Sequence, residues 1–295
     1  MSVLVVGEAL VDVVRHDHGD TVEHPGGSPF NVAVGLARLG VLTTLAAQLA
    51  DDAHGDLLHE HLLASDVELD DLSPTPERTS TAAATLAADG TAHYDFDLVW
   101  KPDSLPDPDA FSALHVGSLG TILMPGSRLV AQIVARAHAV GVPVSFDANV
   151  RLTVEPDVAR WRQVFDTLAP LATVLRMSDD DASVLFPGRD VGDVAAELAT
   201  EQRLVAITRG GDGAVLATAT HVVEIGAPAV DVVDTIGAGD SFTAALLAGL
   251  AARGWPTASD LRADDLTMLG DYAARAAAIT CSRPGADPPT AADLT

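Results

Sequence analysis

The sequence predicts an α/β protein in which a mostly parallel central sheet lies between two layers of helices. Short apolar runs rich in β-branched residues alternate with helical segments of about ten residues or more, the pattern of a three-layer α/β/α sandwich. The helical segments end at glycines, as helix C-termini commonly do. Hydrophobic residues make up 48% of the 295-residue chain, which is ample for a large buried core.

The first strand and the first clear helix lie near the N-terminus. Residues 3–6 form a short run of Val and Leu that is typical of a buried strand. We expect Ser28 to be the N-cap and Pro29 the first residue of a helix that continues over 31–39 and ends at Gly40.

Further elements of the same kind follow in the second half of the chain. A helix is predicted over 129–140, and strands over 143–146, 173–177 and 204–208. Arg176 is unusual for a buried strand. Ligands gather at the carboxyl ends of parallel strands, so the polar residues after these strands are candidates for a functional site.

Two segments interrupt the alternation. Residues 10–23 and 81–98 alternate in polarity, and Asp89 with Gly90 predicts a hairpin turn in the second segment. Together they could form a small sheet that acts as a lid on the main sheet. The sequence has no internal repeat or long linker, so residues 1–295 are predicted to be one domain.

Charge and cysteine content exclude some classes of function. The chain has 42 acidic and 17 basic residues and a formal net charge of −25, with no basic stripe that could neutralise a phosphate backbone. Nucleic acids and anionic membranes are therefore not expected partners. Cys281 is the only cysteine, no signal peptide or membrane span is apparent, and the predicted location is the cytoplasm.

The most informative motif is Asp-Thr-Ile-Gly-Ala-Gly-Asp-Ser-Phe at 234–242, which leads into an apolar helical stretch over 243–252. Asp240 lies beside a turn of small residues whose backbone N–H groups would point at an anion bound at the helix N-terminus. The motif thus offers a base next to an anion site. From spacing alone, an ordinary glycine turn with Asp240 as a helix cap explains it equally well.

The phosphate-binding motifs of other nucleotide-binding proteins are absent. Lys101 is the only lysine, and it lies in neither a Walker A loop nor the strand motif of protein kinases. Backbone amides and arginine would have to hold a triphosphate here. The Gly-x-Gly at 237–239 lies in the last fifth of the chain, whereas a dinucleotide fingerprint belongs on the first strand, which disfavours an oxidoreductase.

The motif at 234–240 resembles the C-terminal signature of the ribokinase-like (PfkB) sugar kinases, and residues 26–33 with 39–40 resemble their N-terminal signature. The resemblance implies a ribokinase-like fold with a small β-sheet lid. Within the family the chain is most similar to bacterial fructokinases, on the segments 7–12, 147–151, 178–181 and 281–289. The activity this implies is the ATP-dependent phosphorylation of a sugar primary hydroxyl, with fructose as the first choice.

The resemblance also assigns roles to residues. It makes Asp240 the general base, and the amides of Gly237, Ala238, Gly239 and Asp240 an anion hole for the transferred phosphoryl group. The positions that match sugar contacts or follow the strand over 143–146 are Asp12, Gly27, Ser28, Asn31, Asn149 and Arg151. The positions that match nucleotide contacts are Thr208, Gly210, Gly213 and Ser178.

Two ions are implied besides ATP. The family's Asn-x-x-Glu motif, which places magnesium and phosphate, stands here as Ser178-x-x-Asp181. Because both side chains are shorter, Asp181 is expected to contact Mg²⁺ through water. Asp234 and the backbone near Gly285 match a monovalent-cation site known in parts of the family, so K⁺ could also bind.

Several alternatives stay open. The sugar could be 2-keto-3-deoxygluconate, whose carboxylate Arg151 could pair with, or ribose. A nucleoside is less favoured because aromatic residues make up only 4% of the chain. A sugar-binding regulatory protein on the same fold is the non-enzymatic alternative. The strand edges of a lid could also join two copies into a homodimer.

Overall fold

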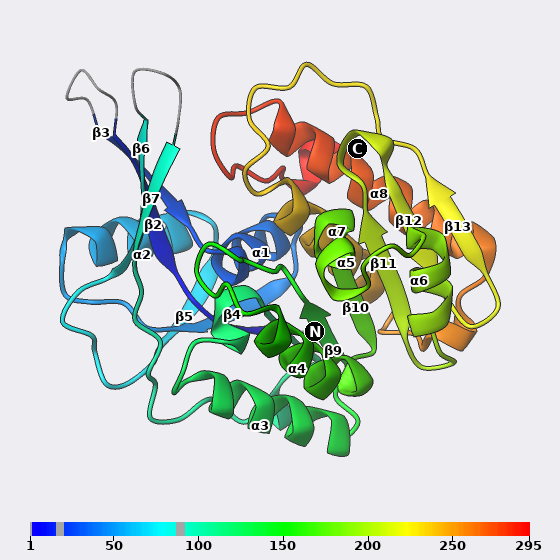
Figure 1. Ribbon diagram of the computed structural model, residues 1–295, viewed down its shortest axis with the longest axis horizontal. Helices are drawn as coiled ribbons and strands as arrows, with labels where there is room; N and C mark the ends of the chain where they lie inside the picture. Colours follow the sequence, from blue (N-terminus) through cyan, green and yellow to red (C-terminus); the bar gives the residue numbers. More distant parts are fainter. Residues whose placement is uncertain (1, 16–20, 87–91) are drawn as a thin grey trace.

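A nine-stranded sheet forms the centre of the protein, for which a computed structural model describes residues 2–15, 21–86 and 92–295 (Figure 1). The strand order is β13-β12-β11-β10-β9-β8-β1-β4-β5. All neighbouring strands run parallel except at one edge, where β12 is antiparallel to both β11 and β13. The strands are β1 (Ser2–Val6), β4 (Leu42–Ala47), β5 (Val67–Asp71), β8 (Ala113–Gly117), β9 (Val144–Asp147), β10 (Val174–Ser178), β11 (Leu204–Thr208), β12 (Ala214–Ala217) and β13 (Val222–Ile225).

Helices cover both faces of this sheet, which confirms the three-layer sandwich. One core lies beneath α1 (Ser28–Arg38), α2 (Ala53–Ala64), α7 (Ala238–Ala252) and α8 (Ala263–Cys281). The other lies beneath α3 (Ser127–Ala139), α4 (Val158–Leu168), α5 (Asp179–Leu185) and α6 (Val191–Leu198). Short 3₁₀ turns lie at Pro108–Ala110, Ser118–Thr121, Ala169–Leu171, Gly210–Asp212, Ala258–Asp260 and Ala291–Leu294. None of the helices in the described ranges is long and apolar enough to cross a membrane.

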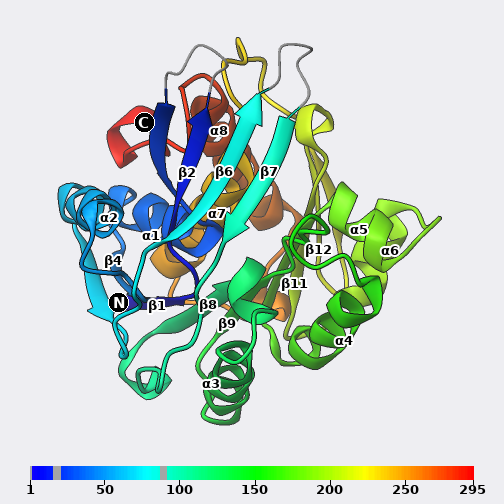
Figure 2. The same ribbon diagram turned by 60° about the vertical axis from the view of Figure 1, so that its left-hand side comes forward.

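A separate four-stranded sheet projects from the main body (Figures 1 and 2). Its order is β3-β2-β6-β7, so strands from both predicted segments pair with each other. The strands are β2 (Leu10–Arg15), β3 (Thr21–Gly26), β6 (Ser80–Leu86) and β7 (Ala92–Asp97). The small sheet is therefore confirmed. The predicted turn at Asp89 and Gly90 lies outside the described residues.

Most predicted elements agree with the structure within one or two residues, but the predicted N-cap of the first helix is wrong. The N-cap of α1 is Gly27, with φ 99°, and the side chain of Ser28 makes no capping hydrogen bond. The apolar stretch over 243–252 lies within α7, which begins at Ala238, so the glycine motif forms the start of this helix as expected.

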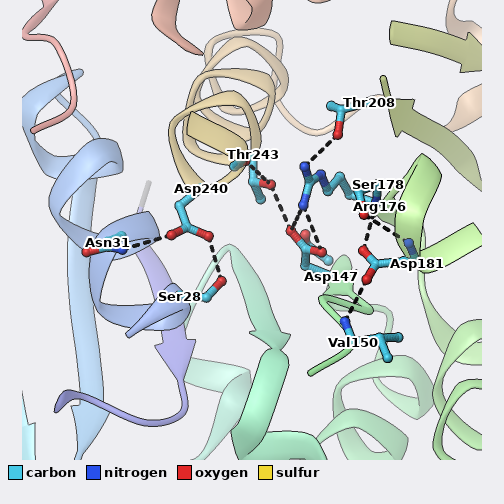
Figure 3. A network of polar contacts seen from close by, with 12 residues as sticks. Ser28, Asn31, Asp147, Val150, Arg176, Ser178, Asp181, Thr208, Asp240 and Thr243 are labelled. Carbon is cyan, nitrogen blue, oxygen red and sulfur yellow. Dashed lines mark hydrogen bonds and ion pairs between the residues drawn. The ribbon is translucent and has the colours of Figure 1, made fainter. Parts of the chain in front are cut away.

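Parallel strands place their carboxyl ends along one edge of the sheet. The ends of β9, β10 and β11 bring Asp147, Ser178 and Thr208 together beside the N-terminus of α7 (Figure 3). The strand β1 continues through Glu8 into β2, which carries the chain from this edge into the small sheet.

Candidate active site

Asp240 lies in the first turn of α7 and faces the start of α1 (Figure 3). Its Oδ1 accepts a hydrogen bond from Ser28 Oγ at 2.7 Å, and its Oδ2 accepts one from Asn31 Nδ2 at 2.8 Å. The side chain of Asp240 does not cap its own helix. The two donors therefore fix the direction of the carboxylate. The Ser28 side chain, which was predicted to cap α1, donates to Asp240 instead.

The turn before α7 leaves backbone N–H groups free at the helix start. Gly237 is in the left-handed conformation, with φ 74°, and a Cβ there would lie 2.5 Å from the Cβ of Ala286. The first helical hydrogen bond runs from Ser241 N to Gly237 O. The N–H groups of Gly239 and Asp240 thus have no acceptor within the helix, as an anion hole requires. The N–H of Ala238 is 3.3 Å from Thr235 O and is less free.

A buried polar network lies directly under this turn. The Arg176 guanidinium contacts Asp147 Oδ2 at 3.0 Å and donates to Thr208 Oγ1 at 2.6 Å. Thr243 Oγ1 lies 3.1 Å from the same Asp147 oxygen. Burial raises the pKa of Asp147 to about 6, against the opposing effect of Arg176. The network ties the ends of β9, β10 and β11 to α7 (Figure 3).

The predicted sugar-side residues gather where the small sheet meets the main body. A Cβ on Gly26 would lie 2.2 Å from Asp12 Oδ2, and a Cβ on Gly27 would lie 2.8 Å from Glu8 O. At Gly27 the clash is with backbone and φ is 99°, so only glycine fits, whereas a side chain at Gly26 would require the Asp12 carboxylate to move. Burial raises the pKa of Asp12 to about 6; the charge of Asp240 raises it further, while His24 lowers it.

Asn149 and Arg151 follow β9 in different environments. Asn149 is buried with φ 36°, and its Nδ2 has no hydrogen-bond partner among the described residues. Arg151 is exposed and donates to Val150 O at 3.0 Å. Its charge lowers the pKa of Asp12, which places it within electrostatic reach of that carboxyl.

The predicted nucleotide residues after β11 differ in what they can offer a ligand. Thr208 accepts a hydrogen bond from Arg176. Gly213 donates its N–H to Gly210 O, and a Cβ there would lie 1.9 Å from Ile225 O, so its need for glycine is explained by packing. Gly210 has φ 51° and open space where a Cβ would be.

Ser178 and Asp181 form the capping box of α5. Ser178 Oγ accepts from Asp181 N at 3.0 Å, and Asp181 Oδ2 accepts from Ser178 N at 2.8 Å. The other oxygen of Asp181 accepts from Val150 N at 2.7 Å. Both carboxylate oxygens of Asp181 therefore accept hydrogen bonds from backbone N–H groups.

Asp234 is the first residue of the glycine motif and accepts hydrogen bonds from the backbone on both sides of α7 and α8. It accepts hydrogen bonds from Ile236 N at 3.0 Å and from Gly285 N at 2.9 Å. These hydrogen bonds join the loop before α7 to the loop after α8. No group of three or more His, Cys, Asp or Glu side chains suited to a metal occurs within the described ranges.

Three buried charged residues at this edge of the sheet were missed as site residues: Glu8, Asp147 and Arg176. Glu8 accepts hydrogen bonds from Leu119 N and Gly120 N, and burial raises its pKa to about 7. The signal for Arg176 was present in the sequence, since a charge inside an apolar strand needs a buried partner.

Comparisons with known proteins agree over nearly the whole chain. The model of the pfkB family of carbohydrate kinases matches residues 1–293. A fructokinase of Klebsiella pneumoniae is 32% identical over 276 residues, which cover 90% of each chain. The structure of a Xylella fastidiosa fructokinase with bound ATP has a TM-score of 0.84 and 25% identity, covering 99% of this chain and 96% of that one. A Vibrio cholerae fructokinase with fructose, ADP and calcium has a TM-score of 0.81 and 25% identity, covering 97% and 94%.

Proposed function

Because the chain belongs to the pfkB family of carbohydrate kinases, and is thus a phosphotransferase acting on a sugar hydroxyl, we propose that it phosphorylates fructose with ATP to give fructose 6-phosphate. The observation that carries the proposal is the position of Asp240. Its carboxylate lies between the hydrogen-bond donors of α1 and the free amides of α7. The named relatives support fructose as the sugar.

In this proposal the sugar oxygen attacks the γ-phosphorus of ATP. A new P–O bond forms, the bond to the β–γ bridging oxygen breaks, and ADP leaves. Asp240 accepts the proton as the hydroxyl attacks, because a carboxylate is far too weak to deprotonate a free alcohol beforehand. The amides of Gly239 and Asp240, with those of Gly237 and Ala238, stabilise the charge on the transferred group.

The sugar is held by polar groups around Asp240. The carboxylate of Asp12 accepts hydrogen bonds from hydroxyl groups, and the unpartnered Nδ2 of Asn149 can donate one. The complete proposed set is Asp12, Gly27, Ser28, Asn31, Asn149 and Arg151. Asp12 accepts with both oxygens only when it is ionised, which at its raised pKa of about 6 holds above about pH 6.

ATP occupies the other side of the glycine turn, near Thr208, Gly210, Gly213 and Ser178. Magnesium, when bound to the phosphates, would neutralise part of their charge, with Asp181 contacting it through water. Asp234 with the backbone near Gly285 is the proposed place for a monovalent cation such as K⁺.

Replacement of Asp240 by Asn tests the assignment of the base. Asn keeps the shape and one acceptor oxygen but cannot take the proton, so kcat should fall about 10²- to 10⁴-fold. Circular dichroism and thermal unfolding check that the variant folds. A kcat within threefold of the unaltered protein would reject Asp240 as the base.

The sugar itself is tested by measuring ADP release across a panel of acceptors. Fructose should give the highest kcat/KM. Fast turnover of 2-keto-3-deoxygluconate or ribose, with none of fructose, would replace the substrate while leaving the catalytic assignment intact.

We also propose that residues 1–295 act as one domain in the cytoplasm and that the small sheet closes over the sugar as a lid. Lid closure would exclude water that competes for the phosphoryl group. The edge strands β3 and β7 would let two lids pair in a homodimer.

Light scattering at micromolar concentration tests the dimer. The unaltered protein should have twice the mass of the chain. Val22→Lys should shift the mass toward one chain, because Val22 is exposed on the edge strand β3 and a charge there opposes pairing. A monomeric unaltered protein would contradict the proposal.

A further inference from the structure

Arg176 is a buried cation in the middle of the central strand β10. Among the Arg and Lys residues whose side chains are described, it alone is buried, with 5% of its surface exposed. A charge in such a place costs free energy unless it is paired. Asp147 provides the pairing, but a nonpolar pair of similar volume could fill the same space without that cost. The cost of burying this charge raises the question of a further role for it.

The position of the guanidinium relative to the glycine turn suggests that role. A Cβ added to Gly239 would lie 2.6 Å from Arg176 Nη2 and 3.1 Å from Nη1. The guanidinium therefore packs directly against the backbone of Gly239, one residue before Asp240. It approaches the turn from inside the protein, where water cannot screen its charge.

Carboxylates outnumber this cation at the turn. Asp147 on β9, Asp181 on α5 and Asp240 on α7 all interact electrostatically with Arg176. His115 on β8 also faces it, and burial with the Arg176 charge lowers the pKa of that imidazole to about 3, so it adds no positive charge. Without Arg176, a phosphate arriving at the turn would meet only negative charges from the protein interior.

We propose that Arg176 is a positioning residue for phosphoryl transfer, whose charge beneath Gly239 makes the anion hole electropositive. It does not contact the phosphate. Its hydrogen bonds to Asp147 and Thr208 fix the guanidinium, and Thr243 links Asp147 to α7. The inference rests on the proposed function, because it takes the γ-phosphoryl group to lie at this turn.

The test uses a double variant, Arg176→Met with Asp147→Asn, which removes the ion pair without leaving a buried charge unpaired. Its kcat should fall about 10²-fold, similar to the loss of one oxyanion donor. Calorimetry without sugar should show ATP binding about tenfold weaker but ADP binding within threefold, because only ATP carries a γ-phosphate to the turn. A purely structural role would weaken both nucleotides alike.

Two further variants complete the design. Arg176→Lys retains the charge and should keep kcat within tenfold of the unaltered protein. Arg189→Met removes an exposed arginine paired with Glu197 and should change kcat less than twofold. Thermal unfolding verifies each variant.

The inference is overturned if the folded double variant keeps kcat within threefold, or if it loses ATP and ADP affinity equally. A 10²-fold loss in Arg176→Lys would also overturn it, and this outcome can be read even if the double variant does not fold. Failure of the proposed function would instead be seen in the unaltered protein, as a lack of ATP-dependent phosphorylation of any sugar.

Discussion

Glu8, which follows the carboxyl end of β1, shows how a single buried residue can make the free energy of unfolding depend on pH. Burial raises its pKa from 4.5 to about 7, so the folded state retains a proton that the unfolded state releases. The free energy of unfolding must then fall as the pH rises from about 4.5 to about 7. The difference of about 2.5 pKa units corresponds to about 3 kcal/mol.

We predict that Glu8→Gln removes this decline, because glutamine does not titrate. Urea denaturation at pH 5 and pH 8 measures it. The free energy of unfolding should fall between these two pH values by roughly 2.5 kcal/mol more in the unaltered protein than in the variant. Asp12 and Asp147 also have raised pKa values, but they act equally in both proteins. Equal pH dependence of the two proteins would contradict the prediction.

The residues that the sequence singled out for the candidate site lie mostly in motifs or directly after strands. The sequence drew attention to Asp240, and the structure places it against Ser28 and Asn31 from the other signature. Arg176 and Asp147 could not be joined in advance, because their contact depends on β9 and β10 being neighbours. Strand order is not readable from local composition.

At the scale of elements, the glycine turn before α7 combines a backbone conformation with a close contact. We predict that Gly237→Ala lowers stability by about 1–3 kcal/mol and reduces kcat. A Cβ would be strained at φ 74° and would also collide with Ala286, which must displace the first turn of α7 and its amides.

Gly40→Ala is the matched control. Gly40 has φ 83°, but nothing lies within 4 Å of an added Cβ, so only the conformational cost applies. It should be less destabilising than Gly237→Ala and should leave kcat unchanged. Thermal unfolding and steady-state kinetics compare the two variants, and equal losses of kcat would contradict the role given to the turn.

Strands and helices with a clear hydrophobic pattern were predicted from the sequence. The other strands were not, because their composition does not distinguish strand from helix or loop. The strands β1 and β11 consist mostly of Val, Leu and Ile and are bounded by loops. The strands β4, β8 and β12 are rich in Ala or contain a polar residue, so periodicity does not separate them from helix or loop. Their pairing in the sheet decides their conformation.

At the scale of the whole molecule, a net charge of −25 opposes the compact state. Raising NaCl from 0.1 M to 1 M shortens the screening length from about 10 Å to about 3 Å and should stabilise the fold. We predict a gain of roughly 1 kcal/mol, which would move the urea midpoint by about 0.3–1 M.

The same measurement near the isoelectric point of about 4.4 provides the control. There the net charge approaches zero, so salt should have much less effect on the midpoint. A midpoint at pH 7 that falls or stays constant with salt would show that self-repulsion does not limit stability.

The hydrogen bonds from Ser28 and Asn31 to Asp240 span 212 and 209 positions of the chain. Residues from the start of the chain and from α7 must therefore meet before Asp240, the proposed base, has these two donors. During synthesis α1 leaves the ribosome long before α7 exists, and no N-terminal fragment that ends before α7 can contain the complete proposed site. Phosphoryl transfer should thus begin abruptly, only once α7 has been made and packed against α1.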